Sequence, residues 1–215
     1  MSIESKRTTF GCLIFPDAEE LDFIGPWEMF TMWGLTPSGP EQCLIVAETA
    51  GPVRCAKGLS VNPHATVADC PPLDILLVPG GVGTRTQVDN PVLIDFIARR
   101  ASECRAVLSV CTGAFMLQRA GLLAGRRATT HWTSLGRLRA LPDVEVVEER
   151  IVRDGSVWTS AGISAGIDLA LAFIASEAGD AVAGAVQLQA EYYPLTTRYG
   201  DAHRRDGAPE YLRVP

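Results

Sequence analysis

The stretch RAVLSVCTGAFMLQRAGLLAG, residues 105–125, decides the fold. Its first part, Ala106 to Val110, is a short and mostly apolar run, which is typical of a strand buried on both faces of a parallel sheet. Cys111 follows with no intervening loop, and a helix-like stretch runs from Thr112 to Ala120, ending near Gly121. A strand that turns directly into a helix predicts a nucleophile elbow, a tight corner that presents one side chain above the sheet.

The same alternation of strand and helix extends along the rest of the chain. Buried strands are predicted over 9–16, 43–48, 73–79 and 105–110, hairpins over 53–67 and 144–160, and a further strand over 126–130. Helices are predicted over 21–33, 91–104, 112–120, 132–141, 163–178 and 180–192, and Pro26 is acceptable in the first of these only near its first turn. This pattern indicates an α/β sandwich in which a mostly parallel central sheet carries helices on both faces.

The parallel sheet predicts where a ligand would bind. Ligands of open α/β sheets bind outside the carboxyl ends of the strands. Asp22, the Gly80-Gly81 pair and Cys111 each follow such an end. We therefore expect these residues to converge.

Composition and charge exclude several classes of protein. The chain has 215 residues, a net charge of −6 and a pI near 5.1, which argue against a surface that binds nucleic acid. No run of about 18 apolar residues predicts a membrane helix, and the N-terminus MSIESKRTTF lacks the apolar core of a signal peptide. We expect one cytoplasmic domain over residues 1–215, with flexible tails at about 1–8 and 196–215.

The six cysteines form no CxxC pair and no Cys/His cluster, so neither a zinc site nor a disulfide scaffold is predicted. A small buried hydrophobe is the default interpretation of each cysteine. Cys111 is the exception, because the first N–H groups of a helix favour a negative charge beside them. This position predicts a reactive thiol with a lowered pKa, and the alternative is a buried cysteine at a strand end.

Three further features could contribute chemistry, and each has a structural alternative. The glycines of PGGVG could let the N–H groups of Gly81 and Thr112 hold an oxyanion, or could simply make a tight loop. Asp22 could be a general acid and base with a raised pKa, or the N-cap of the following helix. His131 could be a base beside the thiol, or a residue with a structural hydrogen bond at the start of a helix.

Four segments together resemble the DJ-1/PfpI superfamily, and within it the bacterial isocyanide hydratases. They are FPDAEELDFIGPWEMF, CPPLDILLVPGGVGT, LSVCTGAFMLQRAGLLAGRRATTHW and TSAGISAGIDLAL. The resemblance implies a flavodoxin-like fold, a homodimer without metal or organic cofactor, and a small isocyanide as substrate. The segments RRATTHW and SAGI also resemble amidase-like domains of some transcription regulators, whose downstream helix-turn-helix region this chain would have no room for.

The resemblance also implies roles for individual residues. Cys111 matches the nucleophile, Asp22 the acid that stands where other branches have glutamate, and Thr112 the residue that helps to orient this aspartate. Gly80 and Gly81 match glycines whose backbone lines the site. Ile163 matches a residue packed near the cysteine. His131 matches a histidine common in the superfamily that the hydratases do not use as a base.

The resulting hypothesis is attack by Cys111 on an isocyanide to give a thioimidate, which water then hydrolyses to an N-substituted formamide with Asp22 moving the protons. One rival is an amidase, protease or glyoxalase that uses the same cysteine. The other is a thiol redox sensor without enzymatic activity.

Overall fold

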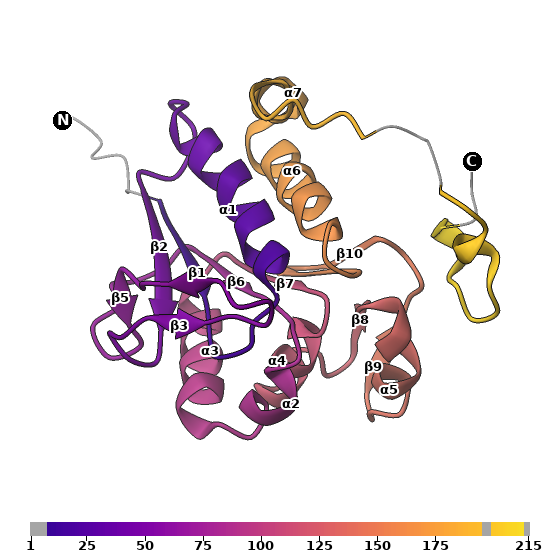
Figure 1. Cartoon of the computed structure of the whole chain (residues 1–215). Coiled ribbons are helices and arrows are strands. Elements are labelled where there is room, and N and C mark those ends of the chain that lie inside the picture. The colour runs from indigo at the N-terminus through magenta and orange to yellow at the C-terminus, as the bar shows by residue number, and fades with distance from the viewer. Residues whose placement is uncertain (1–7, 195–198, 213–215) are drawn as a thin grey trace.

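The computed structural model describes residues 8–194 and 199–212, and its centre is one twisted sheet (Figure 1). The strands of this sheet are β1 (Thr9–Leu13), β2 (Gln42–Ala47), β5 (Ala65–Thr66), β6 (Ile75–Val78), β7 (Ala106–Val110), β10 (Ile151–Asp154) and β11 (Val157–Ser160). They lie in the order β10-β11-β7-β6-β1-β2-β5, and only the β10–β11 pair is antiparallel. The predicted class of sheet is therefore confirmed.

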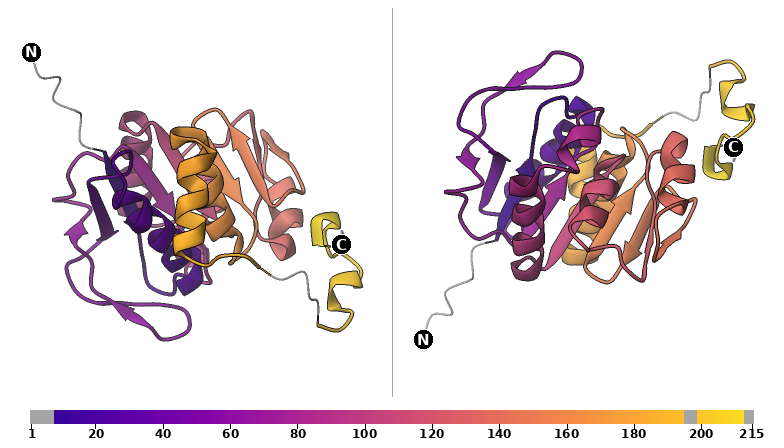
Figure 2. Two further views of the ribbon diagram at one scale, coloured as in Figure 1. Left: turned by 90° about the horizontal axis from the view of Figure 1, so that it is seen from above. Right: turned by 90° about the horizontal axis from the view of Figure 1, so that it is seen from below.

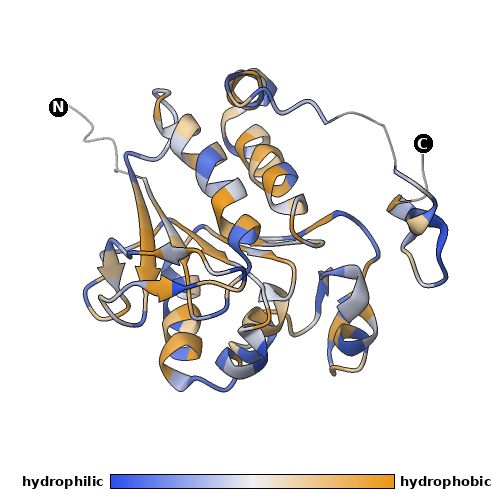
Figure 3. Ribbon diagram, in the orientation of Figure 1, coloured by the Kyte–Doolittle hydropathy of each residue, from blue (hydrophilic) through white to orange (hydrophobic). Residues whose placement is uncertain are grey.

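Helices cover both faces of the sheet, and each view of Figure 2 shows the helices of one face in front of the strands. One layer contains α1 (Glu20–Gly34), α6 (Ala165–Ala178) and α7 (Asp180–Gln189), and the other contains α2 (Thr84–Gln87), α3 (Pro91–Glu103) and α4 (Gly113–Arg119). Because both faces are covered, every residue of β1, β6 and β7 is buried. Figure 3 shows hydrophobic residues concentrated on the central strands and on α6.

Helix α3 shows how local sequence sets an element. The Asn90 side chain accepts a hydrogen bond from the Val92 N–H at 3.0 Å, and Pro91 takes the first helical position, as the sequence predicts. Leu93, Phe96 and Ile97 recur at helical spacing and form the buried face of the helix.

Helix α1 differs from the prediction in two ways. It begins at Glu20 with Glu19 as N-cap, so Asp22 lies inside the first turn, and the N-cap interpretation of Asp22 is wrong. Pro26 lies beyond the first turn, where it has no N–H to donate to the Asp22 carbonyl. Close packing compensates, because the Pro26 ring fits against Gly166 of α6, where an added Cβ would lie 2.9 Å from it.

Several predicted elements are shorter than expected or divided. The segment 53–67 contains the small hairpin of β3 (Val53–Arg54) and β4 (Ser60–Val61), but β5 joins the main sheet. The first strand of the hairpin predicted over 144–160 divides, since β9 (Val144–Val146) pairs in parallel with β8 (Arg126–Ala128) in a separate sheet. The predicted helix over 132–141 becomes a 3-10 turn η1 (Trp132–Ser134) followed by α5 (Leu135–Arg139).

Both predicted tails are only partly described. Residues 1–7, 195–198 and 213–215 lie outside the described residues. Residues 199–212 form the 3-10 turns η2 (Ala202–Arg204) and η3 (Glu210–Leu212), and the Arg205 guanidinium lies 5.3 Å from the centre of the Trp132 ring. Within the described part of the chain, no helix is long and apolar enough to cross a membrane.

Candidate active site

Cys111 occupies the corner between β7 and α4, in a conformation that L-residues rarely adopt. Its φ is +56°, in the left-handed region, and such strain persists only where the surroundings impose it. The Cys111 N–H donates to the carbonyls of Ser160 and Ala161, and its own carbonyl accepts from the Thr130 hydroxyl at 2.7 Å. The predicted elbow is therefore present and held on both sides.

Gly113 makes the tight corner possible. A Cβ at this position would lie 2.3 Å from the carbonyl oxygen of Val78 at the end of β6. Because real Cβ atoms do not approach backbone oxygen that closely, only glycine lets α4 start directly above the sheet.

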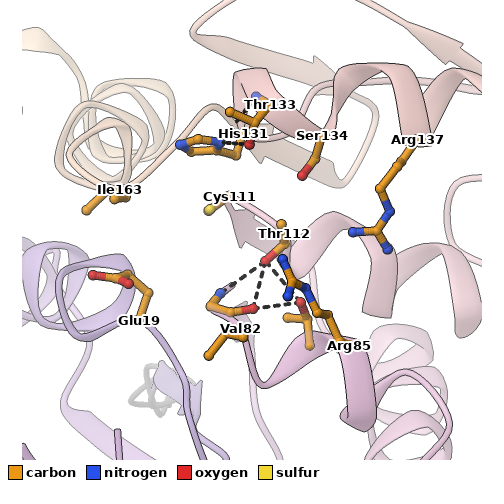
Figure 4. Close-up of a pocket in the computed structure, with 12 residues that line it drawn as sticks. Glu19, Val82, Arg85, Cys111, Thr112, His131, Thr133, Ser134, Arg137 and Ile163 are labelled. Atoms are coloured by element: carbon orange, nitrogen blue, oxygen red, sulfur yellow. Dashed lines mark hydrogen bonds between the residues drawn. The ribbon is translucent and has the colours of Figure 1, made fainter. Parts of the chain in front are cut away.

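A cavity of about 210 Å³ opens over Cys111 at the carboxyl ends of the strands (Figure 4). This volume is below the range of about 300–1,000 Å³ that is typical of sites for drug-sized ligands, so it suits a small molecule. The lining residues are Glu19, Gly81, Val82, Thr84, Arg85, Cys111, Thr112, His131, Thr133, Ser134, Arg137 and Ile163.

Asp22 is fully buried beside Cys111 and does not itself line the cavity. Its Oδ2 accepts the Gly80 N–H at 2.8 Å, and its Oδ1 has no hydrogen-bond partner among the described residues. Burial raises the pKa of Asp22 to about 7 and the charge of Glu19 adds to this, while the Gly80 N–H and the Cys111 side chain oppose it. A carboxyl group with this pKa can hold or release a proton near neutral pH.

The thiol of Cys111 differs from the sequence prediction. Burial raises the pKa of Cys111 to about 12 and the negative charge on Asp22 adds to this, while the N–H and hydroxyl of Thr112 and the N–H of Ile163 oppose it. The predicted lowering of this pKa is therefore wrong, because removal of the thiolate from water outweighs the helix N-terminus. The thiol keeps its proton at neutral pH unless a neighbour takes it.

The N–H groups near the sulfur are not the pair that was predicted. The Gly81 N–H donates to the Thr112 hydroxyl at 3.0 Å and is already occupied. The N–H groups of Thr112 and Ile163 face the sulfur instead. Ile163 has a φ of +52°, so a second strained residue brings its N–H to the site from the segment before α6.

The Thr112 hydroxyl belongs to a small network that holds the glycine turn. It bonds with the N–H and carbonyl of Gly81 and with the Thr84 hydroxyl at 3.1 Å (Figure 4). Asp22 is bonded by Gly80, the neighbour of Gly81. Among the described residues no direct hydrogen bond joins Thr112 to Asp22, and the glycine turn is the link between them.

His131 lines the cavity, and its Nδ1 takes part in a local hydrogen-bond pair. The Thr133 N–H donates to His131 Nδ1 at 3.3 Å, and the Thr133 hydroxyl lies 2.8 Å from the same atom. Burial lowers the pKa of His131, which keeps the ring neutral. Within the described residues no hydrogen bond joins His131 to Cys111, so the geometry matches the structural interpretation of this histidine.

The structure adds residues that sequence reasoning missed. Thr84, Arg85 and Arg137 line the cavity, as does the backbone N–H of Ile163. Arg85 closely follows the PGGVG turn at a strand end, and this position could have identified it as a site residue from the sequence. Arg137 lies on a five-residue helix far along the chain, and no motif marks it. Among the described residues no cluster of His, Cys, Asp or Glu side chains has a metal-site arrangement.

Comparison with known proteins gives a consistent set of relatives. Residues 11–176 match the DJ-1/PfpI family. The isonitrile hydratase of Pseudomonas putida is 42% identical over 188 residues, which are 86% of this chain and 78% of that protein. The HTH-type transcriptional regulator CdhR of Pseudomonas aeruginosa is 28% identical over 91% of this chain, which spans 62% of the regulator.

A solved structure supports the same grouping. The crystal structure of a ThiJ/PfpI family protein from Pseudomonas syringae superposes with a TM-score of 0.84 at 32% sequence identity. The match covers 97% of this chain and 84% of that one.

Proposed function

The chain belongs to the DJ-1/PfpI family, and on that premise we propose that it is an isocyanide hydratase, which adds water to an isocyanide and releases an N-substituted formamide. Isonitrile is another word for isocyanide, so the similar Pseudomonas putida enzyme supports this reaction. The observation that carries the proposal is the pairing of Cys111, which lines a small cavity, with the buried carboxyl group of Asp22 beside it. The direct test is whether the protein converts an alkyl isocyanide into the matching formamide.

Attack by the thiol requires a base, and Asp22 is the group placed to act as one. Because burial holds the pKa of the Cys111 thiol high, a free thiolate is not the resting nucleophile. The Asp22 carboxylate takes the thiol proton as sulfur bonds to the terminal carbon of the isocyanide. Asp22 then gives that proton to the same carbon, and the product is a thioimidate, Cys–S–CH=N–R.

Hydrolysis of the thioimidate uses the same pair of residues. Water adds to the thioimidate carbon while the Asp22 carboxylate accepts one of its protons, and the nitrogen gains a proton as the adduct forms and breaks down. The carbon–sulfur bond then breaks, the thiol is restored, and R–NH–CHO leaves. The N–H groups of Thr112 and Ile163 hold negative charge on the departing sulfur.

The other functions that the sequence left open are less well supported. A cysteine amidase or protease that uses a histidine as its base needs that histidine paired with the thiol, and among the described residues the hydrogen bonds of His131 go to Thr133 and not to Cys111. A redox sensor needs an exposed thiol of low pKa, whereas the Cys111 side chain is buried and its pKa is raised.

We expect kcat/KM for isocyanide hydration to fall by about tenfold for each pH unit below about pH 7. The reason is that the reactive form carries one proton shared by Asp22 and Cys111. Below about pH 7, Asp22 binds a second proton, and the protonated carboxyl group can no longer accept the proton of the Cys111 thiol. Steady-state kinetics between pH 5 and 9, with circular dichroism to confirm folding, measure this profile. A profile that stays flat below pH 7 would contradict the role of Asp22.

Gly80→Ala should lower kcat/KM by about a hundredfold, since displacements of about 1 Å at a reacting site can have effects of this size. The added Cβ would lie 2.5 Å from the Thr112 nitrogen and 2.8 Å from Asp22 Oδ2, so it would push apart the groups that serve the thiol. Gly184→Ala in α7 is the matched control, because its Cβ meets nothing within 4 Å. Steady-state kinetics and thermal unfolding of both variants measure the difference. If Gly80→Ala is as active as Gly184→Ala, the position of the glycine turn does not control the reaction.

We further propose that the protein acts as one domain over residues 1–215, in the cytoplasm and as a homodimer. All six cysteines are free thiols, which suits a reducing compartment. The dimer follows from the family resemblance. Light scattering coupled to size-exclusion chromatography tests it, with twice the chain mass of 23.1 kDa as the supporting result.

A further inference from the structure

Two arginines lie at the same side of the cavity over Cys111. Arg85 extends from α2 and Arg137 from α5, and Figure 4 shows both guanidinium groups beyond Thr112 as seen from the sulfur. Glu19 lies on the opposite side of the cavity in the same view. The positive charge that faces the cavity is therefore gathered at one end.

Neither arginine has an acidic partner in the described part of the chain. The arginine ion pairs found there use other residues, and Glu19 is held by Lys57 at 2.5 Å. Arg137 instead packs over the Phe115 ring, 4.6 Å from its centre, which positions its side chain without neutralising it. Two like charges that face one cavity without a counterion favour an anionic ligand.

The ligand chemistry follows from the shape of the charged groups. Guanidinium groups bind planar carboxylates through paired N–H donors, and such charge-assisted hydrogen bonds are the stronger kind. The rest of a short molecule would then extend toward Cys111, and the cavity of about 210 Å³ limits its length.

We propose that Arg85 and Arg137 bind a carboxylate on the substrate, so that the preferred substrates are short isocyanides that carry a carboxylate group. This inference rests on the proposed hydratase function and assigns its substrate class. The carboxylate anchors the molecule and the isocyanide carbon reaches the sulfur.

The test compares two probes that differ in charge at one end, isocyanoacetate and isocyanoacetamide. We expect wild-type kcat/KM to be about tenfold or more higher for isocyanoacetate, and this ratio to decrease as ionic strength rises. The double variant Arg85→Gln/Arg137→Gln should bring the ratio close to one. The double variant Arg99→Gln/Arg127→Gln removes two exposed arginines outside the cavity, so it is the matched control for net charge and should keep the wild-type ratio.

The outcomes separate this inference from the proposed function. Equal hydration of both probes by the wild type, or a preference that survives in the double variant, overturns the carboxylate site and leaves the hydratase standing. If neither probe is hydrated, the protein does not hydrate this class of isocyanide, and a binding measurement then tests whether the arginines hold a carboxylate. Calorimetry would then support the site if N-formylglycine binds the wild type more tightly than N-formylglycinamide and the double variant loses that difference. Equal binding of the two would overturn it.

Discussion

Asp22→Asn should abolish isocyanide hydration and at the same time stabilise the folded protein. Asparagine keeps the size of the side chain and an oxygen for the Gly80 N–H, but it can neither accept the thiol proton nor return it. Loss of a positioned acid and base lowers rates by about a hundredfold to ten-thousandfold, and Asp22 serves two steps, so we expect a loss toward the upper limit. Steady-state formamide production measures it.

The stability gain follows from the raised pKa of Asp22. Between about pH 4 and pH 7 the folded carboxyl keeps its proton while the unfolded one releases it. The free energy of unfolding of the wild type therefore falls as pH rises through this window, and the loss is complete above about pH 7. A shift from 3.8 to about 7 corresponds to at most about 4 kcal/mol. The Asp22→Asn variant has no carboxyl group to ionise at this position, so it does not lose stability in this way. Its free energy of unfolding should therefore exceed that of the wild type most at pH 8 and only slightly near pH 4.

Chemical denaturation at pH 4 and pH 8 measures the stability effect. Asp95→Asn is the matched control, because Asp95 is exposed on α3, and this variant should match the wild type in both activity and stability. An active Asp22→Asn enzyme would contradict the proton-transfer role of Asp22. If Asp22→Asn is less stable than the wild type at pH 8, the claim that the buried Asp22 carboxylate destabilises the fold is wrong.

Cys111→Ala should lose all measurable hydration, because the nucleophile and hence the thioimidate are removed. Removal of a covalent nucleophile can lower kcat by about a millionfold, which exceeds the loss expected for Asp22→Asn. Formation of the formamide, followed by NMR over hours, measures the residual rate. Cys43→Ala on β2 removes a thiol outside the cavity and should keep wild-type activity. Turnover by Cys111→Ala above a few per cent of the wild-type rate would show that another group performs the chemistry.

The architecture was predictable from local patterns. Continuous apolar runs such as Ala106 to Val110 predicted a covered parallel sheet, and Asn90-Pro91 predicted the start of α3. The errors came where tertiary packing overrides local preference. Pro26 remains inside α1 because α6 offers Gly166 for the ring to pack against, and no feature near Pro26 in the sequence marks that contact.

The site was predictable in position and less so in chemistry. The sequence predicted that Cys111, Asp22 and the glycine turn lie together, because the carboxyl ends of parallel strands meet at one edge of the sheet. The sign of the Cys111 pKa shift depends on how deeply the thiol is buried, and sequence alone does not give this. The N–H of Ile163 and the guanidinium of Arg137 reach the cavity from distant segments, so their roles emerge only from the fold.

Isocyanide hydration at Cys111 is tested most directly by infrared spectroscopy. The measurement follows a simple alkyl isocyanide with wild-type protein, beside Cys111→Ala at the same concentration. We expect the isocyanide band to disappear and the formamide carbonyl band to appear with the wild type alone. No formamide from the wild type across several alkyl isocyanides, or equal formamide from both proteins, would contradict hydration by this thiol.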